Sequence, residues 1–192
     1  MICALAHKLF SVMADQYPNL STELIKFIEE QHIFFVATAA PEGRINLSPK
    51  GQDSLRVINA SELLWLNLTG SGNETAAHLL ETPRITMMWC AFQGPPNIVR
   101  VYGSAQAIHQ KDPEWQDCTD VLPPVLGARQ YLKVNIDLVQ TSCGYAVPLM
   151  DYQEDRQVLS MWAEKRGPQG IEDYWAEKNQ VSLDGKPTGI LD

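Results

Sequence analysis

The chain has 192 residues, of which 45% are hydrophobic and 20% charged, and its formal net charge is −8. These values are typical of a globular protein with an ordinary core, so we expect a single domain over residues 1–192. The negative charge argues against non-specific nucleic-acid binding, which needs a basic surface. No stretch approaches the roughly 20 apolar residues that a membrane-spanning helix needs.

The residue types also argue against a metal enzyme and against export. The four cysteines and four histidines are scattered, without a C-x-x-C pair or an H-E-x-x-H motif. The first 17 residues, MICALAHKLFSVMADQY, lack the charged-then-apolar layout of a signal peptide. We therefore expect residues 1–20 to form an N-terminal arm or helix, and the protein to be cytoplasmic.

The first half of the chain predicts one helix and a meander of strands. Residues 21–31 have an apolar stripe at helical spacing, and Ser21 or Thr22 can cap the N-terminus. Strands are predicted over 32–40, 44–50, 54–58 and 63–68. In the second of these, Ile45 and Leu47 point one way, and Pro49 favours a sheet edge or a bulge. The opposite face carries Arg44, Asn46, Ser48 and Lys50, a pattern that by itself is most typical of a solvated strand face.

The second half adds a glycine-rich loop and longer strands. TGSGN (69–73) precedes a helix over 74–81, and strands follow over 84–91 and 98–109, the latter with a bend or bulge at Gly103. A helix is predicted to begin at Asp112-Pro113. Residues 131–140 alternate so that one face carries Leu132, Val134, Ile136 and Leu138. Six or seven strands with short turns indicate a closed or partly open barrel.

The C-terminal part, roughly 151–180, has an acidic and helical pattern. WAEK occurs at 162–165 and again at 175–178, with Gly167-Pro168 between the copies. We expect two short helices, each of which anchors a tryptophan on the barrel.

The loop TGSGN is the first candidate for a binding site. Glycines let backbone N–H groups approach a ligand, and a helix N-terminus attracts phosphate. An ordinary strand-to-helix connection capped by Asn73 is at least as common. The negative charge of Glu74 in the first helical turn also opposes a phosphate there.

The order of motifs resembles that of the pyridoxamine-phosphate-oxidase-like family. RINLSPKG, LTGSGNETAAHLLETPRITMMW and PPNIVRVYG follow one another in that order, and the resemblance covers roughly residues 20–140. It implies a mainly β fold with flanking helices, a split β-barrel of the Greek-key, FMN-binding type. The barrel would cover 20–141 and a helical tail 142–192. It also implies a homodimer with FMN at the subunit interface and a small-molecule substrate.

Carried over residue by residue, the resemblance implies that Lys50 grips the phosphate, that residues 46–50 approach the flavin ring, and that residues 69–75 form the phosphate loop. We name no catalytic acid or base, because none of the four histidines falls in a motif. The candidate cofactor-binding residues are Asn46, Ser48, Pro49, Lys50, Thr69, Ser71, Asn73 and Thr75.

One departure from the family pattern concerns the start of the short helix. True pyridoxamine-phosphate oxidases have Ser-Arg-Lys there, whereas this chain has Glu74-Thr75-Ala76 without a base. We therefore do not expect pyridoxamine-phosphate oxidation itself. Three hypotheses stay open: a flavin-dependent oxidoreductase with FMN or a deazaflavin, a non-enzymatic carrier or sensor of a flavin, haem or other planar ligand, and a ligand-free protein in which Glu74 replaces the phosphate.

Overall fold

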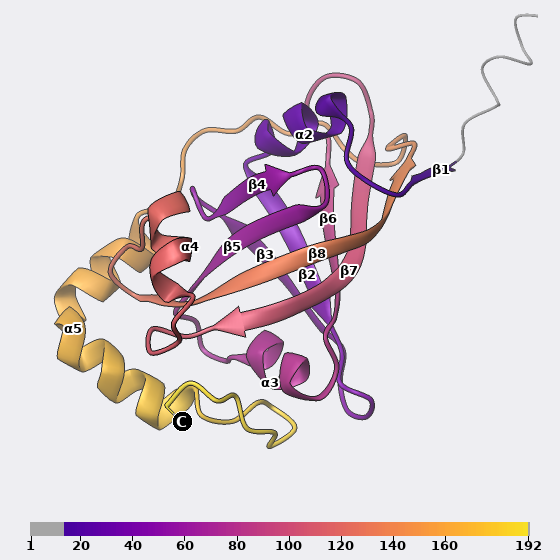
Figure 1. The fold of residues 1–192 in the computed structure, drawn as a ribbon. Helices are drawn as coiled ribbons and strands as arrows, with labels where there is room; N and C mark the ends of the chain where they lie inside the picture. Colours follow the sequence, from indigo (N-terminus) through magenta and orange to yellow (C-terminus); the bar gives the residue numbers. More distant parts are fainter. Residues whose placement is uncertain (1–13, 192) are drawn as a thin grey trace, which may run out of the picture.

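The structure, a computed structural model, describes residues 14–191, in which one antiparallel sheet is flanked by helices (Figure 1). The expected N-terminal arm falls largely on residues 1–13, outside the described residues. The strands are β1 Ala14–Tyr17, β2 Ile33–Thr38, β3 Asn46–Gly51, β4 Leu55–Asn59, β5 Glu62–Leu68, β6 Arg84–Cys90, β7 Ile98–Ile108 and β8 Ala128–Ser142. The helices are α2 Thr22–Glu29, α3 Glu74–Glu81, α4 Trp115–Val121 and α5 Val158–Lys178.

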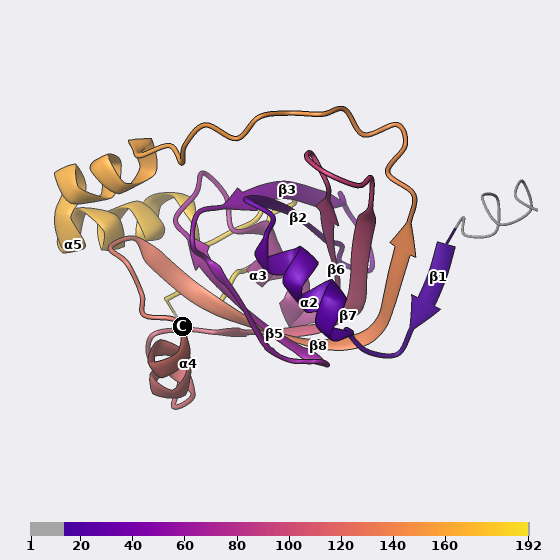
Figure 2. The ribbon, with the colours of Figure 1, turned by 90° about the horizontal axis from the view of Figure 1, so that it is seen from above.

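The strands pair in the order β3-β2-β6-β7-β8-β5-β4, with β1 added to β8. The sheet curls into a barrel, as the view from above shows (Figure 2), and α2 lies over one end of that barrel (Figure 1). β3 and β4 are consecutive in the chain yet lie at opposite ends of this order, so the barrel is split between them. This confirms the expected mainly β split barrel. The edge position of β3 agrees with the prediction made from Pro49. Proline has no backbone N–H to donate to a strand on either side, so it is tolerated at a sheet edge.

The core lies inside the curled sheet and is dominated by large apolar side chains. Phe34 packs on Trp89 with ring centroids 6.0 Å apart and meets Trp65 edge-on at 6.1 Å. Ile28 of α2 is 1% exposed and joins the same cluster. Ser21 accepts a hydrogen bond from the backbone N–H of Leu24 at 3.3 Å, which is the predicted cap of α2.

A bulge between β7 and β8 confirms one prediction and corrects another. The pairing register shifts after Tyr102, so that Asp137 is the extra residue on β8. Gly103 is needed here because a Cβ at this position would lie 1.9 Å from the backbone oxygen of Asn135. The extra residue switches the faces of β8. The predicted alternation therefore holds only as far as Ile136; Leu138 is partly exposed and Val139 is buried in its place.

The helical predictions for the second half need two corrections. Helix α4 begins at Trp115 rather than at Pro113, because Asp112 accepts a hydrogen bond from the backbone N–H of His109 in a preceding turn. Of the expected helical tail 142–192, the described residues 143–191 are helical only over α5, and residues 151–157 have no regular secondary structure. Within α5, Gly167 has φ 67° and ψ 173°, which separates two helical halves as the Gly-Pro pair predicted.

The two WAEK tryptophans have different environments. Trp175 is 7% exposed, and its Nε1 donates to Thr69 Oγ1 at 2.8 Å, so it anchors α5 on the barrel as expected. Trp162 instead packs edge-on against Tyr174 of the other half of α5, with centroids 5.1 Å apart.

Candidate functional site

The polar face of β3 points into the barrel, which overturns its interpretation as a solvated face. Directly opposite residues of neighbouring strands share a face of the sheet. On the other face, Leu47 is 65% exposed, and Ile45, just before the strand, is 76% exposed. The inward residues of β3 lie opposite buried residues of β2: Asn46 opposite Thr38, Ser48 opposite Val36, and Lys50 opposite Phe34.

Lys50 is therefore a cation on the inner side of the barrel. Its Nζ lies 5.3 Å from the centroid of the Trp65 ring, a cation–π arrangement. Burial, together with the positive charge of Arg129, lowers the pKa of Lys50 to about 8. Within residues 14–191 the ammonium group forms no ion pair with a carboxylate. A negatively charged ligand would stabilise the ammonium form and so offset the lowering of the Lys50 pKa by burial and by Arg129.

Arg129 is a second inward cation, and sequence reasoning missed it. It lies near the start of β8 and is 3% exposed. Its Nη1 donates to the backbone oxygen of Gly72 at 2.9 Å and to Asn179 Oδ1 at 2.8 Å, while its buried Nε has no partner among the described residues. Burial lowers the pKa of Arg129 to about 10, which leaves it charged at neutral pH.

The loop between β5 and α3 brings the predicted phosphate residues close to these cations. Thr69 accepts from Trp175 and donates to the backbone oxygen of Gly127 at 2.8 Å. Ser71 is exposed at the loop tip. Thr75 is 4% exposed, and its Oγ1 accepts from Asn46 Nδ2 at 3.3 Å, which joins the loop to β3.

Asn73 occupies the N-cap position of α3 without capping it. Its amide exchanges two hydrogen bonds with the Gln130 amide, at 2.9 and 3.3 Å, and makes no bond to the helix backbone. The interpretation of Asn73 as an ordinary cap is therefore wrong. The first turn of α3 has no side-chain cap at that position, and this leaves its N–H groups available.

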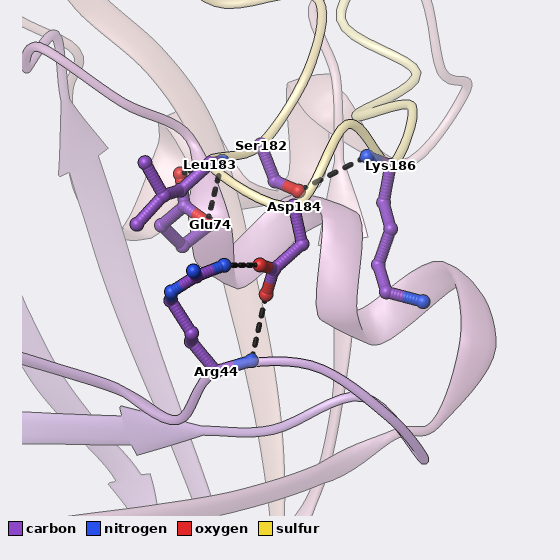
Figure 3. Close-up of polar contacts among 6 residues, drawn as sticks. All are labelled: Arg44, Glu74, Ser182, Leu183, Asp184 and Lys186. Atoms are coloured by element: carbon purple, nitrogen blue, oxygen red, sulfur yellow. Dashed lines mark hydrogen bonds and ion pairs between the residues drawn. The ribbon is translucent and has the colours of Figure 1, made fainter.

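The C-terminal residues 181–187, which we call the C-terminal strap, lie across the same region (Figure 3). Both carboxylate oxygens of Glu74 accept from the Leu183 backbone N–H, at 3.0 and 3.1 Å. Asp184 accepts from the backbone N–H of Arg44 at 2.6 Å and forms an ion pair with the Arg44 guanidinium. In the sequence analysis, the negative charge of Glu74 argued against a phosphate at this helix start. In the structure, the Glu74 carboxylate is bound by the Leu183 N–H of the C-terminal strap.

Together these elements enclose a cavity of about 800 Å³, the central cavity. Its walls are β3, the end of β5, the loop 69–72, Arg129 and part of the C-terminal strap. Seven of the eight candidate residues line it, and Asn73 does not. The seven are Asn46, Ser48, Pro49, Lys50, Thr69, Ser71 and Thr75.

The central cavity carries no histidine among its described lining residues, and Glu74 is its one carboxylate there. Among residues 14–191, no cluster of three His, Cys, Asp or Glu side chains could hold a metal ion. The helices of the described chain include none that is long and apolar enough to cross a membrane. The two cations and the polar groups of the lining make the cavity suited to an anionic ligand.

Comparison with solved structures finds several with a similar fold at low sequence identity. An FMN-binding protein from Syntrophomonas wolfei matches with a TM-score of 0.47 and 15% identity, covering 79% of this chain and 99% of that one. HutZ, described as a haem storage protein from Vibrio cholerae, matches with a TM-score of 0.47 and 15% identity, covering 66% and 97%. These values are too low to bear on what this chain binds.

Sequence comparison identifies the family. The sequence model for pyridoxamine 5'-phosphate oxidase matches residues 20–143, which is more than half of the chain. The pyridoxamine 5'-phosphate oxidase family protein ustO of Aspergillus flavus is 35% identical over 189 residues, covering 89% of this chain and 76% of that protein. The chain belongs to the pyridoxamine 5'-phosphate oxidase family.

Proposed function

We propose that the protein binds a flavin in the central cavity and acts as a flavin-dependent oxidoreductase on a small molecule. The observation that carries this proposal is the pair of inward cations, Lys50 and Arg129, neither of which forms an ion pair with a carboxylate in residues 14–191. Buried charges are usually paired or bind a ligand. The phosphate of FMN is the partner that we assign to both.

Groups along the length of the central cavity support this proposal. At the phosphate end, the unpartnered Nε of Arg129 and the N-terminus of α3 supply donors beside the loop 69–72. Arg129 thereby supplies, from β8, the base that the start of the short helix lacks. Along the inner face of β3, Asn46 and Ser48 present polar groups, which we assign to the ring.

In this proposal the bound flavin supplies the hydride or electron transfer. Lys50 and Arg129 hold the phosphate, and Asn46 and Ser48 orient the ring. The C-terminal strap limits the access of water to the site. A haem carrier is less well supported, because no histidine lines the central cavity among the described residues. Pyridoxamine-phosphate oxidation is not proposed, and location in the cytoplasm is part of the proposal.

We also propose a homodimer whose interface includes the outer face of β3. Leu47 of this edge strand and Ile45 just before it are 65% and 76% exposed, whereas the inward face of β3 is polar, the reverse of an ordinary half-buried strand. An exposed apolar strand edge of this kind favours contact with another chain. In such a dimer the flavin ring lies near the interface.

Flavin titration of the purified protein tests the proposal. We expect uptake of FMN with flavin absorption bands, and a loss of affinity of about tenfold or more for Arg129→Gln, since hydrogen bonds to charged groups contribute about 1.5–3 kcal/mol. Arg84→Gln is the matched control, because Arg84 is exposed and lies outside the cavity. A colourless protein that takes up no added flavin would contradict the proposal. A bound flavin that no nicotinamide donor reduces would instead favour a carrier.

A further inference from the structure

A second cavity, of about 590 Å³, opens beside the central cavity, and we call it the lateral cavity. The two cavities adjoin each other at the end of β3 and at the glycine-rich loop. Six residues line both of them: Gly51, Gln52, Thr69, Gly70, Ser71 and Leu159.

One wall of the lateral cavity is aromatic. Trp162 and Tyr174 come from the two halves of α5, and the turn at Gly167 brings them together. The guanidinium of Arg166 lies 5.2 Å from the Trp162 ring centroid and 5.1 Å from that of Tyr174. This cation–π arrangement holds the two rings in a defined orientation.

The lateral cavity is fixed to the barrel by polar contacts. Gln52, which has a positive φ of 58°, donates from Nε2 to the backbone oxygen of Arg156 at 3.2 Å. Trp175 bonds to Thr69 on the opposite side. The aromatic wall lies in α5, beyond residues 20–143 that match the family model. The lateral cavity therefore combines residues of the matched region with an aromatic wall that lies outside it.

The position of the lateral cavity indicates what kind of group it holds. It joins the central cavity at Thr69–Ser71, the loop to which the flavin phosphate is assigned. In FMN the phosphate is the last group of the molecule. A group that continues past this loop therefore belongs to a longer cofactor, while a substrate must instead approach the ring at the other end.

The lining favours a nucleobase. Trp162 and Tyr174 offer aromatic surfaces, and Val158 and Leu159 add apolar area. Glu154 and Asp155 also line the cavity, and a carboxylate such as that of Glu154 can accept hydrogen bonds from an exocyclic amino group. Adenine combines a flat apolar ring with such an amino group.

We propose that the lateral cavity binds the adenine ring of FAD, so that the dinucleotide is the preferred flavin of this protein. The proposal rests on flavin binding in the central cavity. In this proposal the diphosphate lies along the loop 69–71, and Arg129, which lines the adjoining central cavity, supplies the positive charge.

Parallel titrations of the full chain with FAD and FMN test this. We expect FAD to bind at least about tenfold more tightly than FMN, because base stacking on an aromatic side chain contributes about 1–3 kcal/mol. Trp162→Ala should remove most of that preference and leave FMN affinity within about twofold. Trp162→Phe should retain most of it. Tyr145→Ala, an exposed aromatic residue outside both cavities, is the matched control.

Each outcome separates this proposal from the one on which it rests. FMN and FAD binding with equal affinity to the unmodified protein would overturn the adenine site and leave the flavin site standing. A preference for FAD that survives in a folded Trp162→Ala variant would also overturn it. If neither flavin binds, both proposals fail. If Trp162→Ala does not fold, the comparison of the two flavins on the unmodified protein still decides.

Discussion

The environment of Lys50 is the main residue-level finding. Along the chain, polar residues that include Lys50 alternate with the apolar Ile45 and Leu47, as in an amphipathic strand. Here the polar side faces the inside of the barrel. Placing an ammonium group inside a barrel beside Arg129 costs free energy, and its lowered pKa reflects that cost. Such a group is stabilised when an anion binds, so Lys50 couples ligand affinity to pH.

We predict that FMN affinity falls as pH rises through about 8, the pKa of Lys50 in the free protein. A bound phosphate favours the ammonium form and raises its pKa, so binding takes up a proton above that pH. The affinity should therefore decline by up to about tenfold per pH unit. Fluorescence titrations from about pH 7 to about pH 9.5 measure it.

Lys50→Arg is the control for this pH dependence, since a guanidinium stays charged over that range. The variant should give a nearly flat profile. A flat profile for the unmodified protein would remove Lys50 from the phosphate site.

At the level of elements, the C-terminal strap forms part of the wall of the central cavity, with Val181, Ser182 and Leu183 in its lining. Its contacts join positions far apart in the chain: Arg44 with Asp184, and Glu74 with Leu183. Both contacts use carboxylates that accept backbone N–H groups. The Arg44 backbone N–H lowers the pKa of Asp184, so this contact is present at neutral pH and is lost only as pH falls through that lowered pKa.

We predict that Asp184→Ala loosens the C-terminal strap without unfolding the barrel. The lost hydrogen bonds contribute about 1 kcal/mol, so amide exchange at Leu183 and flavin release should each become roughly fivefold faster. Hydrogen exchange and stopped-flow release of the flavin measure the two rates. Asp151→Ala, an exposed acid outside both cavities, should change neither. Unchanged rates in Asp184→Ala would show that the strap does not control access.

For the whole molecule, the unpaired outer face of β3 predicts assembly. We expect the purified protein to be a dimer in sedimentation, and Ile45→Glu with Leu47→Glu to shift it to the monomer, because two carboxylates cannot be buried in an apolar contact. Flavin affinity should fall in the same variant if the ring lies near the interface. Leu80→Glu is the control, since Leu80 is 60% exposed on α3. A monomeric unmodified protein would contradict the prediction.

Local patterns accounted for much of the fold. The bounds of α3 agree with the helix predicted over 74–81, since Pro83 stops it and its residues favour a helix. The strands followed from alternation and from turn residues. The glycine-rich loop was also identified from a local pattern, because the glycines of the loop and the start of the following helix lie within a few residues of each other.

The sequence by itself determined the elements, their order and the family, because each depends on residues that are close together in the chain. Only the tertiary structure decided which face of β3 is inside, and that Arg129 joins Lys50. The strand pattern placed the start of β8 at 131, which left Arg129 in a loop. Its partners Gly72 and Asn179 lie 57 and 50 positions away. Contacts between residues this far apart in the chain depend on how the sheet curls, and the curl of the sheet cannot be predicted from the spacing of residues along the chain.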